Sequence, residues 1–212
     1  MLTRLAACFL SLGLLSNVAG AHEFAQAPQG EVAQARVALP IERAPVDRDA
    51  VKKALEKRRA KNLAAFRAYR KGGVYPHNTF RWGPLNVWKD ADGHLCAAAT
   101  MIAKDGKREL VDATAKANNQ IRLMNVTDGA LLDWIMTSGF TIEEIDRIQA
   151  PMVYPEEPPL ERNFAAEDAK LRAGYAATDT WLVKHAKSAL DRATDRLMAN
   201  PDLARKLVEG TV

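Results

Sequence analysis

Cys96, His94 and His77 are the residues whose types best fit nucleophilic catalysis. A cysteine attacks as the thiolate, and a nearby imidazolium or a helix N-terminus lowers its pKa. His94 and Cys96 are two positions apart, so both would point to the same face of a strand. The small apolar run that surrounds Cys96 instead favours a buried, protonated thiol. A cysteine-dependent hydrolase or transferase is therefore the alternative hypothesis rather than the leading one.

A second group of residues, between positions 75 and 88, has the chemistry of a ligand site. Tryptophan offers a flat apolar surface, and the arginine guanidinium forms a fork that matches a carboxylate or a phosphate. Together they suit a cleft in which a ring stacks and an anion is held, although the same residues could also pack as a loop. The candidate ligand-binding residues are Tyr75, His77, Asn78, Arg81, Trp82 and Trp88.

Known cofactor and metal motifs are absent from the sequence. It has no phosphate loop, dinucleotide glycine pattern, HExxH, paired CxxC or GxSxG. Asp90, Asp92 and His94 are spaced like the start of a calcium loop, but the later acidic ligands are missing, and an ordinary turn explains them better. We therefore expect no metal and no cofactor, and we favour a non-enzymatic protein.

Composition and charge place the chain among ordinary globular proteins. It has 212 residues, of which 48% are hydrophobic and 26% charged, and its formal net charge is +4. Residues 1–21 read as a secretory signal, with Arg4, an apolar run and small residues before a cleavage site after Ala21. Cleavage would remove Cys8 and one positive charge. The remaining charge does not call for a nucleic-acid partner.

These features predict a secreted or periplasmic protein without a transmembrane segment. Residues 22–46, rich in Ala, Gln and Pro, are expected to form a flexible lead, followed by one globular domain over 47–212. A helix–turn–helix appearance over 131–149 is acidic, which argues against DNA and for an α-helical hairpin.

The first predicted helix runs from Asp47 to Lys71, with an aspartate at its start and Gly72-Gly73 at its end. Its apolar face should carry Val51, Leu55, Asn62, Ala65, Phe66 and Tyr69. The opposite face is basic over 52–71 and could contact an anionic surface, or it could simply be solvated. Its cations are Lys52, Lys53, Lys57, Arg59, Lys61, Arg67, Arg70 and Lys71.

Residues 85–100 favour a β-hairpin around Asp90-Ala91-Asp92-Gly93, with the glycine in the left-handed region. The competing interpretation is a helix that starts near Asp92, because Ala97-Ala98-Ala99 favours helix. Cys96 would then lie in the first turn of that helix.

Short helices are predicted over 107–118, 130–138, 141–149 and 201–209, and 150–163 is a proline-rich connector. A long helix is predicted over 164–199, in which apolar residues recur every 11 positions. That stripe should stay on one side of the helix, where it could pack internally or drive self-association.

The expected fold is mainly α with a small β-hairpin (α+β), in which long N- and C-terminal helices pack with the hairpin and the middle helices. The leading functional expectation is an exported protein that binds a small molecule or a partner in the cell envelope, without catalysis.

Overall fold

The computed structural model of the chain describes residues 44–153 and 162–212. The predicted signal peptide, almost all of the lead and most of the connector lie outside these residues. Within them, 66% of residues are helical and none is in a strand. The predicted β-hairpin is therefore wrong, and the described part of the chain is all-α.

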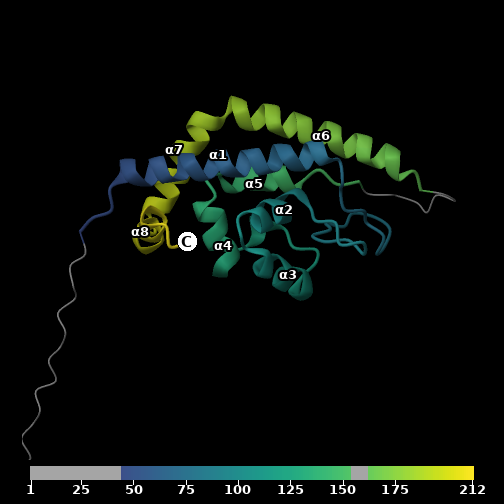
Figure 1. The fold of residues 1–212 in the computed structure, drawn as a ribbon, viewed down its shortest axis with the longest axis horizontal. Helices are drawn as coiled ribbons and strands as arrows, with labels where there is room; N and C mark the ends of the chain where they lie inside the picture. Colours follow the sequence, from purple (N-terminus) through teal and green to yellow (C-terminus); the bar gives the residue numbers. More distant parts are fainter. Residues whose placement is uncertain (1–43, 154–161) are drawn as a thin grey trace, which may run out of the picture. The chain divides into compact units, whose positions relative to one another are not determined.

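The helices follow one another along the chain, and a long segment, residues 73–96, joins α1 to α2 (Figure 1). Their bounds are α1 (Arg48–Gly72), α2 (Ala97–Lys104), α3 (Arg108–Ala117), a 3₁₀ turn η1 (Leu123–Asn125), α4 (Gly129–Thr137), α5 (Ile142–Gln149), α6 (Phe164–Lys184), α7 (Ala186–Met198) and α8 (Pro201–Glu209).

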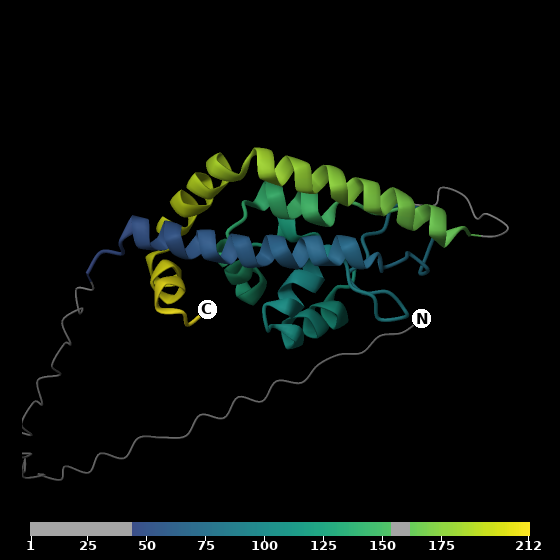
Figure 2. The ribbon, with the colours of Figure 1, turned by 45° about the horizontal axis from the view of Figure 1, so that its top comes forward.

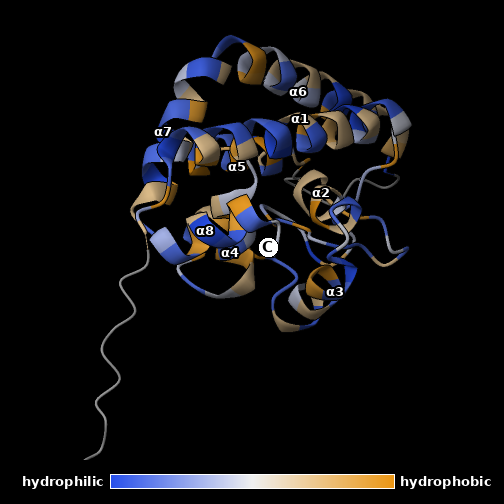
Figure 3. Ribbon diagram, turned by 60° about the vertical axis from the view of Figure 1, so that its left-hand side comes forward, coloured by the Kyte–Doolittle hydropathy of each residue, from blue (hydrophilic) through white to orange (hydrophobic). Residues whose placement is uncertain are grey.

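The long helix α1 follows its sequence signals closely. The Asp47 side chain caps its start by accepting from the Asp49 N–H, and Gly73, with φ of 68°, ends it in the left-handed region. Five of the six residues predicted for its apolar face are buried, and Ala65 is half-buried. Hydrophilic and hydrophobic residues alternate along α1 and α7 in Figure 3, as expected of helices that bury one side.

Two apolar cores lie along α1. The larger one joins Phe66 and Tyr69 of α1 to residues of α2, α3, α4, α5 and α6. The smaller one joins Val51 and Leu55 of α1 to α7, α8 and Met136. Helices α1 and α4 both contribute residues to each core.

The predicted helix over 164–199 is divided in two at His185 (Figure 2). The Trp181 carbonyl accepts from both the backbone N–H and the Nδ1–H of His185, at 3.1 and 2.8 Å, and the His185 ring stacks on Trp181. The chain turns there, so that α6 lies over the larger core and α7 over the smaller one.

A turn replaces the predicted hairpin. Gly93 has the expected left-handed φ, at 87°, but one isolated antiparallel bridge, Lys89 to Leu95, is the only strand-like pairing in the described residues. The segment before the turn bonds elsewhere: the N–H groups of Trp88 and Lys89 donate to the backbone and side-chain oxygens of Asn119. Cys96 then caps α2, which is closer to the competing helical interpretation.

The middle helices agree with their predicted positions to within a residue or two. The capping box of α5 is present, with reciprocal hydrogen bonds between Thr141 and Glu144. Ile145 and Ile148 of this helix are buried, whereas Ile142 is exposed.

Candidate functional site

The loop after α1 is held by the side chain of Asn78, which is buried. Its Oδ1 accepts from the N–H groups of Phe80 and Arg81, at 3.2 and 3.3 Å. Its Nδ2 donates to the carbonyls of Arg81 and Gly83, at 2.7 and 3.2 Å. Because the amide satisfies four backbone groups, it fixes the short loop that carries Phe80, Arg81 and Trp82.

Arg162, just before α6, ties this loop to the helix. Its Nη1 donates to the Asn78 carbonyl at 2.5 Å, and its other nitrogens bind both oxygens of Glu167 at 3.0 and 2.6 Å. The guanidinium also lies over the Phe164 ring, 4.7 Å from its centroid. This bidentate pair therefore holds the first turn of α6 against the loop.

His77 makes a second connection between the loop and α6. Its Nε2 lies 3.0 Å from a carboxylate oxygen of Asp168, and its ring lies 4.4 Å from that of Phe164. Phe164 therefore has a cation on one side and an imidazole beside it.

A cleft of about 270 Å³ lies between the loop and the start of α6. Phe80, Trp82 and Phe164 are 50%, 47% and 40% exposed, and they are the exposed aromatic residues of the described ranges. The Arg81 side chain is exposed too, and no residue in those ranges pairs with it. The lining residues are Asn78, Thr79, Phe80, Arg81, Trp82, Arg162 and Phe164; we call this the aromatic cleft.

Three of the six predicted ligand residues, Asn78, Arg81 and Trp82, line the aromatic cleft, and His77 lies beside it. Tyr75 and Trp88 do not. Both are buried in the larger core, where the Tyr75 hydroxyl donates to the Arg70 carbonyl and the Trp88 Nε1–H to the Val111 carbonyl.

Sequence reasoning missed Phe80, Arg162 and Phe164. Phe80 lies within the predicted loop, and its position between Asn78 and Arg81 could have identified it as a site residue. Arg162 and Phe164 are about 80 residues away, and only the packing of α6 on the loop brings them there.

The three predicted catalytic residues, Cys96, His94 and His77, each bond to other groups. Cys96 is fully buried, its Sγ accepts from the Ala99 N–H at 3.5 Å, and burial raises the pKa of the thiol to about 12. His94 pairs with Asp90 and His77 with Asp168, and no hydrogen bond in the described residues joins either ring to Cys96. The nucleophile hypothesis gains no support from this geometry.

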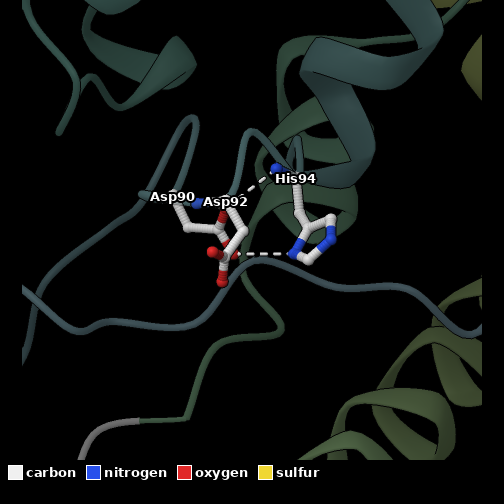
Figure 4. A group of neighbouring side chains, drawn as sticks. All are labelled: Asp90, Asp92 and His94. Atoms are coloured by element: carbon white, nitrogen blue, oxygen red, sulfur yellow. Dashed lines mark hydrogen bonds and ion pairs between the residues drawn. The ribbon is translucent and has the colours of Figure 1, made fainter.

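Asp90, Asp92 and His94 do come together, with ligand atoms within 4.8 Å of one another (Figure 4). The Asp90 carboxylate is already fully engaged, however. One oxygen accepts from the N–H groups of Asp92 and His94, and the other from the His77 N–H and the His94 Nδ1–H. These four bonds close the turn, so we assign the cluster a structural role.

The basic side of α1 is largely paired within the chain. Arg59 binds Glu144, Lys52 binds Asp191, Lys61 binds Asp105, and both Arg67 and Arg70 bind Asp179. Lys53, Lys57 and Lys71 have no such partner in the described ranges. Five of the eight cations of the predicted face over 52–71 thus have carboxylate partners within the chain, although most of the eight side chains remain exposed.

The 11-residue stripe of the C-terminal helices is also used inside the chain. Of its members Phe164, Tyr175, Ala186, Leu197, Leu171, Leu182 and Ala193, five are buried, whereas Phe164 is exposed and Ala186 half-buried. This burial leaves little of the stripe available for self-association.

Among the described residues, no helix has both the length and the apolar character needed to cross a bilayer. No protein-family model, curated protein or solved structure matches the chain.

Proposed function

We propose that the chain is an exported, non-enzymatic binding protein of the cell envelope, and that the aromatic cleft is its ligand site. The observation that carries the proposal is the gathering of Phe80, Trp82 and Phe164 around one opening with Arg81, which has no acidic partner within 44–153 and 162–212. Exposed aromatic side chains are otherwise unfavourable, and a cluster of them on loops held by a rigid framework is typical of binding sites. The signal-like residues 1–21 support export.

The chemistry of the lining favours a flat ring that bears an acidic group. The rings offer stacking surfaces, and Arg81 offers a free guanidinium for a carboxylate or a phosphate. Arg162 is held by Glu167 and the Asn78 carbonyl, so it shapes the wall rather than capturing charge. The cleft is small, which suits a single ring better than an extended chain.

Phenylacetate is a suitable probe, because it combines a ring with a carboxylate. We expect it to shift the indole N–H resonance of Trp82 in a saturable manner, with millimolar affinity or better. Benzyl alcohol, which lacks the acid, and acetate, which lacks the ring, should each bind about five-fold more weakly or worse.

Substitutions then locate the site. Arg81→Ala and Trp82→Ala should each abolish saturable binding, and Arg81→Lys should restore it only in part, because lysine lacks the fork. The matched controls, Lys104→Ala and Met124→Ala, remove an exposed cation and an exposed apolar side chain elsewhere and should leave binding unchanged. Unchanged binding in Arg81→Ala and Trp82→Ala would contradict the proposal.

A further inference from the structure

A second concave surface, chemically unlike the aromatic cleft, lies between the end of α1 and the middle of α6. Its volume is about 620 Å³, and it shares no lining residue with the aromatic cleft. Four of its five lining residues are cations, and we therefore call it the cationic groove. The lining residues are Arg67, Arg70, Lys71, Arg172 and Ala176.

One carboxylate, that of Asp179, pairs with this group. The Arg67 Nε donates to both of its oxygens, at 3.0 and 3.2 Å, and the Arg70 Nη1 lies 3.1 Å from one of them. Lys71 and Arg172 have no acidic partner in the part of the chain that the structure describes. Among the described residues, four cations against one carboxylate leave three positive charges in excess.

Several hydrogen-bond donors of the cationic groove are therefore unused. Asp179 engages Arg67 through Nε and Arg70 through Nη1, so the two Nη groups of Arg67 and the Nη2 of Arg70 have no acceptor among the described residues. Arg67 and Arg70 are 47% and 31% exposed, which leaves these donors accessible. Like charges at this density repel one another, and a bound anion would relieve that repulsion.

Arg172 is placed in the cationic groove by the end of α1. A Cβ on Gly73 would lie 2.6 Å from its Nη2, so the guanidinium packs directly against the glycine that caps the helix. The partial negative charge of a helix C-terminus favours cations and explains why the chain tolerates Arg172 beside Lys71. Ala176, a small side chain, leaves space in front of the guanidinium groups.

We propose that the cationic groove binds a phosphate group, carried either by a soluble phosphate compound or by a lipid headgroup. Arginine forks match phosphate oxygens in a bidentate manner, and the excess positive charge among the described residues favours an anionic phosphate, whether a monoester or a diester. The proposal does not depend on the aromatic cleft, because the two sites have no residue in common.

The test uses the full chain and two double variants with the same change in net charge. Lys71→Gln with Arg172→Gln removes the two cations of the cationic groove that have no carboxylate partner among the described residues. Lys53→Gln with Lys57→Gln removes two exposed cations of α1 outside it, which likewise have no partner in those ranges. Thermal melts of both variants should match that of the unmodified chain, because no described ion pair is lost.

The probes separate the two sources of phosphate. Inorganic pyrophosphate is titrated by calorimetry at low salt, and vesicles of phosphatidylglycerol are compared with vesicles of phosphatidylcholine by sedimentation. Unmodified chain and Lys53/Lys57 control should bind pyrophosphate, the phosphatidylglycerol vesicles, or both, and the Lys71/Arg172 variant should bind at least about ten-fold more weakly. Binding to the vesicles alone identifies a lipid headgroup.

Two results would overturn the proposal. One is the absence of binding to either probe by the unmodified chain. The other is an equal loss in both double variants, because that would report net charge rather than a site. Neither result bears on the aromatic cleft, whose probe and variants are different.

Discussion

Cys96 occupies the N-cap of α2, a position where the helix should stabilise an anion, and yet the pKa of its thiol is raised to about 12. Complete burial is the larger effect, because the thiolate would lose its hydration, and the N–H groups of Ala98 and Ala99 recover only part of that loss. Position at a helix start is thus not sufficient for a reactive thiol.

This burial predicts that a disulfide reagent labels Cys96 only when the chain opens. Labelling of the folded protein should stay slow from pH 7 to 9, whereas protein in denaturant should label at once, with a midpoint near the ordinary thiol pKa of 9.0. Fast labelling of the folded protein at pH 7 would contradict the buried assignment and revive the cysteine-enzyme hypothesis.

The same pKa shift has a consequence for stability. Since the folded pKa lies above the unfolded one, the contribution of the protonated thiol is complete below pH 9 and is lost as the pH rises toward 12, by about 1.4 kcal/mol per pH unit. Cys96→Ala should therefore show a shallower alkaline loss of stability in urea titrations at pH 8 to 10.5.

At the scale of single residues, the sequence located part of the aromatic cleft. Asn78, Arg81 and Trp82 could be predicted because a polar loop residue and an exposed ring and cation follow one another closely. Tyr75 and Trp88 were wrongly grouped with them, since aromatic residues near a loop serve the core as readily as a surface, and only burial distinguishes the two.

At the scale of elements, local signals predicted helix ends well, and tertiary packing decided the rest. Asp47, Gly73 and the Thr141–Glu144 capping box fixed α1 and α5, because each satisfies backbone groups at its own helix end. The break at His185 has no proline or glycine. It arises because the chain turns from one core to the other, which an 11-residue repeat does not reveal.

Gly139, between α4 and α5, lies directly against the backbone of α1. A Cβ there would lie 2.5 Å from the Leu55 carbonyl oxygen and 2.6 Å from the Arg59 backbone nitrogen. Both are backbone atoms of α1, which cannot move aside as a flexible side chain could. We expect Gly139→Ala to reduce the free energy of unfolding by about 4 kcal/mol or more, in urea titrations followed by circular dichroism.

Gly106 provides the matched control, with φ of 87° against 83° at Gly139 and no atom within 4 Å of its Cβ position. Gly106→Ala should cost only the backbone strain of about 1 kcal/mol. Equal losses in the two variants would mean that the close approach to α1 contributes nothing beyond the conformation of glycine.

For the whole molecule, the buried pair of Arg59 and Glu144 joins three helices. Arg59, on α1, binds both carboxylate oxygens of Glu144 at 2.9 and 2.7 Å, and it also donates to the carbonyls of Gly139 and Leu182. The pair links α1 to α5 and to α6, beside the ring of Phe140. In the sequence, Arg59 was simply one cation of a basic face, because the acid that neutralises it is 85 positions away.

Removal of either partner should be costly, because the other charge is then buried without compensation. We expect Arg59→Met and Glu144→Gln each to lower the free energy of unfolding by about 3–5 kcal/mol. The double variant should lose less free energy of unfolding than the two single variants combined, with a coupling of about 1–3 kcal/mol, because the second substitution leaves no buried charge without a partner. Urea unfolding followed by tryptophan fluorescence measures the free energy of unfolding of the unmodified chain, the two single variants and the double variant.

The exposed pair of Arg108 and Asp112 serves as the control. There, Arg108→Met should lower the free energy of unfolding by less than about 1 kcal/mol. Strict additivity at Arg59 and Glu144 would show that the three helices are held by their apolar cores alone.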